Sequence, residues 1–309
     1  MHDELTRWLS DRLGRPVEVT AITRLTVGHS RAMHRVDTDA GTFVLRVEQG
    51  GVFGTSSAEE YRVMSALHRV GFPVARPRWQ ESTTSVLAQP FFVMDFLPGA
   101  AGADERSTDE ATCVAFVDTL ARLHALDPHD LGRVFDLDPT TPGDATHLQI
   151  DRWTGVYRSA ANEPNPLLEE AAAWLHLHAP PLARLSVVHG DAGPGNFAHA
   201  DGAIVALTDW EFAHLGDPAE DWAFCLTMRG VRTLPRDTWL QLFERVGHVV
   251  FDADTWRYWE AFNLFKGACA NLTCLHVFET GANPAPNMAI IGTTLHQVFL
   301  RRLVELVQA

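Results

Sequence analysis

A stretch near the middle of the chain combines side chains that could handle a proton and a metal ion. It reads His189-Gly190-Asp191, then Asn196 five residues after the aspartate, and then Asp209. The glycines and the proline between Asp191 and Asn196 exclude a regular helix, so this part is predicted to be a loop. In phosphoryl transfer, one aspartate accepts the proton of the attacking hydroxyl, while an asparagine and a second aspartate hold magnesium on the nucleotide phosphates. The order of the residues here matches that division of labour.

An ordinary surface turn is the alternative interpretation of this loop, because Gly, Pro, Asp and Asn all favour turns. A turn alone, however, requires neither His189 at its start nor an aspartate after a second strand. The apolar run 203–207, directly before Asp209, is predicted to be such a strand and to be buried. We therefore expect Asp191 to act as the base, and Asn196 and Asp209 to offer oxygen ligands to Mg²⁺.

The elements that must position these residues change character near residue 98. The first 97 residues are predicted to form a strand-rich, nucleotide-binding lobe with one main helix. Pro98–Gly102 is the predicted boundary, and residues 98–309 are predicted to form a mainly helical lobe with the catalytic loop and substrate-binding helices. This indicates an α+β, protein-kinase-like fold. The expected elements are a lead-in helix 5–13, three strands between 17 and 47, a helix from 55 or 57 to 70, two strands ending at 97, helices 108–126, 145–161 and 166–179, a strand-and-loop region 187–209, and several helices after 218.

The motif resembles that of the aminoglycoside phosphotransferase/choline kinase superfamily. The resemblance rests on His-Gly-Asp-x-x-x-x-Asn at 189–196 and Asp-Trp-Glu at 209–211. Four further segments match the family in the same order, and they are 44–46, 60–63, 90–94 and 121–127. Within this superfamily, the sequence resembles the branch of kinase-like domains found with acyl-CoA dehydrogenases. The resemblance implies that Asp191 is the catalytic base, that Asn196 and Asp209 are magnesium ligands and that His189 orients the loop. It also implies that Asp221 supports the loop from the following helix.

The nucleotide side is less clearly marked. Gly28 and Ser30 lie between the first two predicted strands, where a phosphate-covering loop belongs, although a hairpin turn is a comparable interpretation. Arg31 stands where relatives often carry asparagine. Arg46 takes the place of the usual lysine and can still bind phosphate, with Glu60 as its expected ion-pair partner. The alternative is that Arg46 and Glu60 are solvated surface charges.

The segment Met94-Asp95-Phe96 is predicted to be the hinge that contacts the adenine of ATP, or the guanine of GTP, although a buried edge strand has the same pattern. Backbone groups there would bind the edge of the base while apolar side chains pack against its faces.

Composition limits the classes of partner. The chain has 309 residues and a formal net charge of −14, which argues against nucleic-acid binding and is compatible with a cationic substrate. Lys266 is the only lysine, although a nucleotide-binding kinase normally uses a lysine in its N-terminal lobe. The cysteines lack disulfide or zinc spacing and are expected to be reduced thiols; they are Cys113, Cys225, Cys269 and Cys274.

No membrane association is expected. The N-terminus is acidic and lacks an apolar signal core, and the apolar segment 258–278 is interrupted by polar residues. This segment is predicted to be a core helix, and the protein to be soluble and cytoplasmic.

Histidines and aromatic residues of the helical part are further candidates for site residues. His124, His176 and His178 could suggest a metal, but side chains two apart on a helix point to different faces. The aromatic residues between 153 and 262 could line a substrate cleft, although helical spacing favours a core role; they are Trp153, Trp256, Tyr258, Trp259 and Phe262.

The sequence thus predicts a magnesium-dependent kinase that uses ATP or GTP and phosphorylates a hydroxyl of a small molecule. The acceptor classes left open are an amino sugar, an amino alcohol such as choline, a macrolide and a hydroxyacyl thioester. The alternative is a catalytically weak or inactive kinase-like module that binds nucleotide. The missing lobe lysine and the altered glycine loop favour this alternative, whereas the set Asp191, Asn196 and Asp209 opposes it.

Overall fold

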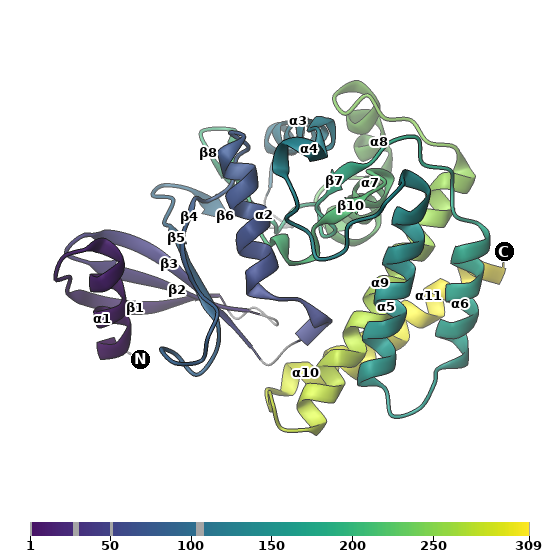
Figure 1. Ribbon diagram of the computed structural model, residues 1–309. Helices are drawn as coiled ribbons and strands as arrows, with labels where there is room; N and C mark the ends of the chain where they lie inside the picture. The colour runs from purple at the N-terminus through teal and green to yellow at the C-terminus, as the bar shows by residue number, and fades with distance from the viewer. Residues whose placement is uncertain (1, 27–30, 50–51, 103–107, 309) are drawn as a thin grey trace.

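The computed structural model describes residues 2–26, 31–49, 52–102 and 108–308. Its N-terminal part is a five-stranded antiparallel sheet in the order β1-β2-β3-β5-β4, with helices α1 and α2 alongside (Figure 1). The elements of this part are α1 (His2–Leu13), β1 (Val19–Thr26), β2 (Arg31–Thr38), β3 (Gly41–Glu48), η1 (Val52–Gly54), α2 (Ser57–Arg69), β4 (Pro77–Glu81) and β5 (Phe91–Asp95).

The two faces of this sheet pack against different helices, because successive side chains of a strand point to opposite sides. On β3, Phe43 and Leu45 join the cluster that contains α1, whereas Val44 joins the cluster that contains α2. Arg46 has the same parity as Val44, and Met94 is the register partner of Val44 on β5. The alternation therefore directs Arg46 and Met94 to the side of the sheet that faces α2 and the rest of the molecule.

The C-terminal part is mostly helical and carries two small sheets, β6-β8-β9 and β7-β10. Its elements are β6 (Ala101–Gly102), α3 (Glu110–Ala125), α4 (Pro128–Leu131), α5 (Pro142–Ala160), α6 (Pro166–Leu177), β7 (Ser186–Val188), β8 (Phe197–Ala200), β9 (Ala203–Leu207), η2 (Trp210–Phe212), β10 (His214–Gly216), α7 (Ala219–Phe224), η3 (Cys225–Arg229), η4 (Gly230–Arg232), α8 (Arg236–Arg245), α9 (Ala253–Glu279), α10 (Pro286–Ile290), η5 (Ile291–Leu295) and α11 (His296–Gln308).

Helix α9 is the centre of this helical part. Helices α5, α7 and α11 pack against it (Figure 1). Most of the residues of α9 are buried, and the buried ones lie on every face of the helix. A helix that is apolar all round belongs in a core. The prediction that 258–278 is a core helix is therefore confirmed, and no helix of the described residues has the length and apolarity needed to cross a bilayer.

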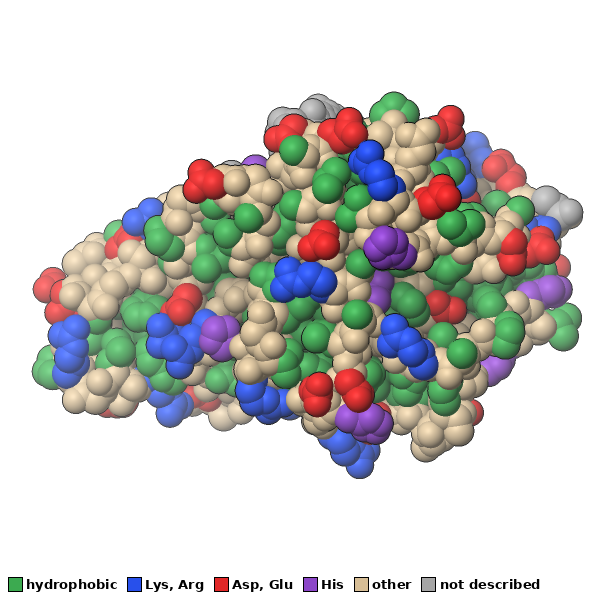
Figure 2. Space-filling view, turned by 90° about the horizontal axis from the view of Figure 1, so that it is seen from above, with side chains coloured by type: hydrophobic (Ala, Val, Ile, Leu, Met, Phe, Trp, Pro, Cys, Tyr) green, Lys and Arg blue, Asp and Glu red, His purple; other side chains and the backbone are tan. Residues whose placement is uncertain are grey.

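The predicted α+β, kinase-like class is confirmed, although some short elements differ from the prediction. The strand-and-loop region continues past Asp209, because β10 pairs with β7. Ala101 and Gly102, which were expected to belong to the boundary, form β6 and pair with β8. The division of the chain at residues 97 and 98 stays a prediction. On the face shown in Figure 2, acidic and basic side chains are interspersed with apolar ones.

Candidate active site

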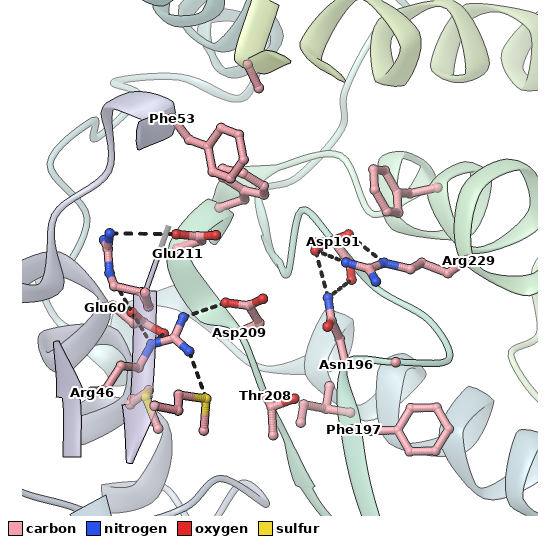
Figure 3. Close-up of a pocket in the computed structure, with 18 of the residues that line it drawn as sticks. Arg46, Phe53, Glu60, Asp191, Asn196, Phe197, Thr208, Asp209, Glu211 and Arg229 are labelled. Atoms are coloured by element: carbon pink, nitrogen blue, oxygen red, sulfur yellow. Dashed lines mark hydrogen bonds and ion pairs between the residues drawn. The ribbon is translucent and has the colours of Figure 1, made fainter. Parts of the chain in front are cut away.

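A cavity of about 590 Å³ lies between the sheet and the helical part, and the residues of the central motif line it (Figure 3). Asp191, Asn196 and Asp209 are all in its wall. The charged and aromatic lining residues are Arg31, Arg46, Phe53, Glu60, Asp191, Phe197, Asp209, Glu211, Phe212, Phe224, Arg229, Lys266 and Phe299.

Backbone contacts fix the loop that carries Asp191. Gly190 has φ +80°, and a Cβ at this position would lie 2.4 Å from the carbonyl oxygen of Phe212, so the position requires glycine. The backbone N–H groups of His189 and Gly190 each donate to the carboxylate of Asp221 at 2.8 Å. The implied support of the loop by Asp221 is thus present as two buried hydrogen bonds.

Asp191 is held by two side chains. Arg229 donates from Nε to Oδ1 at 2.9 Å and from Nη2 to Oδ2. The Nδ2 of Asn196 donates to the Oδ2 of Asp191 at 2.7 Å and to its backbone carbonyl at 2.8 Å. Because the amide nitrogen of Asn196 is turned toward Asp191, its amide oxygen is the atom that can ligate a cation.

His189 is buried beneath the loop. Its Nε2 lies 3.0 Å from the carbonyl oxygen of Thr208, and its Nδ1 lies 3.3 Å from the backbone nitrogen of Asp191, which can donate to it. Burial lowers the pKa of His189, which favours the neutral imidazole. A neutral ring that donates from Nε2 and accepts at Nδ1 satisfies both contacts and joins the loop to the end of β9.

Asp209 follows β9 and meets an arginine from the sheet. Its backbone is left-handed, with φ 69°, and its Oδ1 lies 2.5 Å from Nη2 of Arg46. Burial alone would raise the pKa of Asp209, but the charge of Arg46 and its hydrogen bond outweigh burial and lower it. Asp209 is therefore a carboxylate that faces both the cavity and the sheet.

The predicted pair of Arg46 and Glu60 is formed, with Nε of Arg46 at 2.9 Å from the carboxylate. Their side chains are only 6% and 1% exposed, which excludes the alternative of solvated surface charges. Burial alone would lower the pKa of Arg46, but the charges of Glu60, Asp209 and Glu211 raise it above its ordinary value. The arginine is thus a fixed cation at the cavity wall.

Glu211 adds a fourth carboxyl group to the wall. It accepts a hydrogen bond from Thr55 Oγ1 at 3.2 Å and lies 4.0 Å from a guanidinium nitrogen of Arg31. Burial, together with the charge of Asp209, raises the pKa of Glu211 to about 8. Arg31 is itself buried beside Glu60 at 3.7 Å.

The remaining nucleotide-side residues are only partly at the cavity. Met94 lines it. Asp95 instead pairs with Arg78 at 2.5 Å, and its backbone N–H donates to the carbonyl of Arg76. Phe96 lies beneath the guanidinium of Arg35 and is not in the wall. Gly28 and Ser30 lie outside the described residues, so the expected phosphate-covering loop stays a prediction.

Several wall residues were not predicted as site residues. Arg229 reaches Asp191 from η3, and nothing in the local sequence around it indicates this. Lys266 lies on α9, where its Nζ donates to the carbonyl of Gly190 and to Glu220, both at 2.6 Å. Its uniqueness in the chain is the one sequence signal that could have found it.

The histidines and aromatic residues of the helical part that could suggest a metal site or a substrate cleft lie outside the cavity wall. His124 bonds Asp221 at 2.9 Å, His176 lies beside Asp151, and His178 contacts the carbonyl of Trp174. The five aromatic residues considered for the cleft are absent from the cavity wall and pack in or against the cores. The aromatic wall comes instead from Phe53, Phe197, Phe212, Phe224 and Phe299.

The donor set around Asp209 fits a magnesium ion. Mg²⁺ typically takes one or two carboxylates from the protein and completes its shell with phosphate and water oxygens. Asp209 and the amide oxygen of Asn196 are such hard donors. Among the described residues no cluster of three or more His, Cys, Asp or Glu side chains could hold a metal alone.

Comparison with known proteins identifies the class. The model of the phosphotransferase enzyme family, APH, matches residues 21–262, and the chain belongs to this family. Acyl-CoA dehydrogenase family member 10 of Mus musculus is 29% identical over 299 residues, which cover 86% of this chain and 27% of that protein. The chain spans well under half of the length of the curated relatives it matches, for example 27% of this one and 39% of acyl-CoA dehydrogenase family member 11 of Mus musculus. The resemblance to the kinase-like domains found with acyl-CoA dehydrogenases is confirmed.

Solved structures share the fold at low sequence identity. Choline kinase LicA from Streptococcus pneumoniae has a TM-score of 0.70 and 14% identity over 99% of this chain and 98% of that one. A thermostable mutant of aminoglycoside phosphotransferase APH(4)-Ia has a TM-score of 0.64 and 15% identity over 96% and 98% of the two chains. That structure is a ternary complex with AMP-PNP and hygromycin B.

Proposed function

We propose that this protein transfers the γ-phosphoryl group of ATP or GTP to a hydroxyl of a small molecule. The observation that carries the proposal is the placement of Asp191, Asn196 and Asp209 in one cavity wall opposite the buried cation of Arg46. Membership of the phosphotransferase family supports the reaction type. The complex of the structural relative with AMP-PNP supports the use of a nucleotide.

Asp191 would receive the proton of the acceptor. As the acceptor oxygen bonds to the γ-phosphorus and the bond to the bridging oxygen breaks, the hydroxyl proton passes to the carboxylate. Arg229 and Asn196 hold that carboxylate in one orientation within the wall. The buried loop contacts to Asp221 and Lys266 then fix the backbone beneath it.

Asn196 and Asp209 would hold the magnesium ion of the nucleotide. Bound magnesium supplies charge neutralisation to the phosphate oxygens. Arg46 lies 2.5 Å from Asp209 and would add a second positive group on the sheet side, oriented by Glu60. Because little covalent chemistry is needed, positioning and charge would supply most of the rate.

A nucleotide-binding module without turnover is the second candidate, and the ion pairs of the two aspartates favour it. Asp191 bonds Arg229 and Asp209 bonds Arg46, so each carboxylate already has a cationic partner. Arg46 also replaces the usual lysine of the lobe. Nucleotide consumption by the wild type, and its loss in a variant of Asp191, separate the kinase from this candidate.

The test compares Asp191→Asn with the wild-type protein. Nucleotide consumption is measured over a panel of hydroxyl compounds, and binding of magnesium-ATP and magnesium-GTP by calorimetry. We expect Asp191→Asn to lose turnover by about 10²–10⁴-fold, the typical contribution of a positioned base, while binding is retained. Asp201→Asn, in the exposed β8–β9 turn, is the matched control and should keep wild-type rates. Equal turnover in wild type and Asp191→Asn would refute the role of this residue. Nucleotide binding without any consumption by the wild type would favour the module.

A further inference from the structure

The loop that carries Asp191 leaves room for the side chain of Arg229. It ends η3, a π-helical turn, which is a feature frequent at functional sites. Gly193 of the loop has φ +144°, and a Cβ there would lie 2.4 Å from the Cβ of Arg229. The absence of a side chain at residue 193 is therefore what admits the arginine beside Asp191.

The guanidinium lies beside the place where an acceptor hydroxyl would have to bind. It holds both oxygens of Asp191, through Nε at 2.9 Å and through Nη2. A carboxylate has about four lone-pair sites, so a hydroxyl can still donate to Oδ1 beside Nε. Any acceptor bound in this way places its neighbouring atoms next to the arginine. The side chain of Arg229 is 26% exposed, so a molecule in the cavity can reach it.

The cavity wall has no excess of negative charge that would attract a cationic acceptor. Each of its acidic side chains lies beside an arginine, because Glu60 and Asp209 contact Arg46, Asp191 contacts Arg229, and Glu211 lies near Arg31. On the helical side, Lys266 also lines the wall, and its charge is paired with that of Glu220. The walls between these charges are apolar and come from Phe53, Phe212, Phe224 and Phe299.

We infer that Arg229 is a specificity-determining residue that selects the acceptor by its charge. This inference rests on the proposed function. It selects a hydroxyl compound that carries an anionic oxygen within a few atoms of the reacting hydroxyl, and it disfavours one with an ammonium group there. An oxygen anion near the hydroxyl gains a charged hydrogen bond from the guanidinium, whereas an ammonium meets a like charge at close range. The overall acidity of the chain is then unrelated to the sign of its acceptor.

The test uses three series of probes that differ only in charge: ω-hydroxy acids, ω-amino alcohols and α,ω-diols of three to six carbons. Binding of each probe is measured in the presence of magnesium and AMP-PNP, so that the result does not depend on turnover. The variants are Arg229→Gln, which removes the charge, and Arg229→Lys, which keeps it but loses the two-pronged geometry. Arg236→Gln, an exposed arginine at the start of α8, is the matched control for the loss of one positive charge.

We expect the wild type and Arg236→Gln to bind hydroxy acids at least about tenfold more tightly than amino alcohols, since hydrogen bonds to charged groups are the stronger kind. Arg229→Gln should lose this preference, and Arg229→Lys should retain part of it. In turnover assays the change should appear mainly in KM for the hydroxy acids.

Equal or tighter binding of amino alcohols by the wild type would overturn the inference. An unchanged preference in Arg229→Gln would overturn it as well. If the binding preference is found but neither the wild type nor any variant phosphorylates a probe, the role of Arg229 in selecting the acceptor is supported. The phosphotransferase proposal is then the one that fails.

Discussion

The burial of His189 makes the stability of the loop sensitive to pH. Because burial lowers its pKa below the ordinary value of 6.5, the unfolded chain binds a proton at a pH where the folded protein does not. Stability therefore falls as the pH drops through about 6.5, by at most about 1.4 kcal/mol per pH unit for one proton. We expect His189→Gln to show a shallower loss of unfolding free energy than the wild type between about pH 7.5 and pH 5.5.

Urea unfolding at several pH values measures this difference. His129→Gln, at an exposed position of α4, is the control and should follow the wild-type slope. Parallel slopes for all three proteins would show that His189 does not contribute in this way.

At the residue scale, the sequence predicts what is local and misses what is distant. Asp191 and Asn196 share one loop, and Asp209 follows the next hairpin strand, β9, so spacing alone could group them. Arg229 and Lys266 join the same cavity through the packing of η3 and α9, which no local pattern encodes. The pair of Arg46 and Glu60 was predicted because Arg46 takes the place of the usual kinase lysine and Glu60 lies on the following helix.

Close packing between η5 and α9 requires a glycine. A Cβ on Gly292, in η5, would lie 2.5 Å from the backbone nitrogen of Leu275 in α9. Because backbone atoms cannot move aside cheaply, Gly292→Ala should lower the free energy of unfolding by about 1–3 kcal/mol. Gly155, in the exposed middle of α5, has no atom within 4 Å of such a Cβ. Gly155→Ala should instead stabilise the protein by about 0.5–1 kcal/mol through its helix propensity.

Chemical denaturation of the two glycine variants and the wild type gives both values. An equal effect of the two substitutions would contradict the close contact between η5 and α9.

At the element scale, long periodic segments were predictable and short ones were not. The main helices and the five strands of the sheet follow from hydrophobic pattern and from turn residues. β10 was missed because its three residues acquire strand structure only by pairing with β7. The turn η1 was also missed, since Phe53 has φ 67° and is held there by partners far along the chain.

Contacts of η1 join the sheet part to the helical part directly. Phe53 N–H donates to Thr273 Oγ1 on α9 at 3.0 Å, and Val52 is buried with Cys274 and Val277. The cavity wall is likewise shared, with Arg46 from β3 and Asp209 after β9 in contact across it. A ligand in the cavity that bonds to both parts must therefore stabilise the whole molecule.

Magnesium-nucleotide should raise the unfolding free energy by about 2.7 kcal/mol when it is present at about 100 times its dissociation constant, provided that it binds only the folded state. Because Asp209 would ligate the metal, addition of EDTA should remove much of this increment, leaving that of the free nucleotide.

Asp209→Asn keeps a residue type that tolerates the left-handed backbone. It should behave in the presence of magnesium as the wild type does in EDTA, whereas Asp191→Asn should retain the full effect. Thermal unfolding with nucleotide, with and without EDTA, measures all three. A stabilisation that is the same with and without EDTA would place the metal elsewhere, and so would an Asp209→Asn variant that responds fully to magnesium.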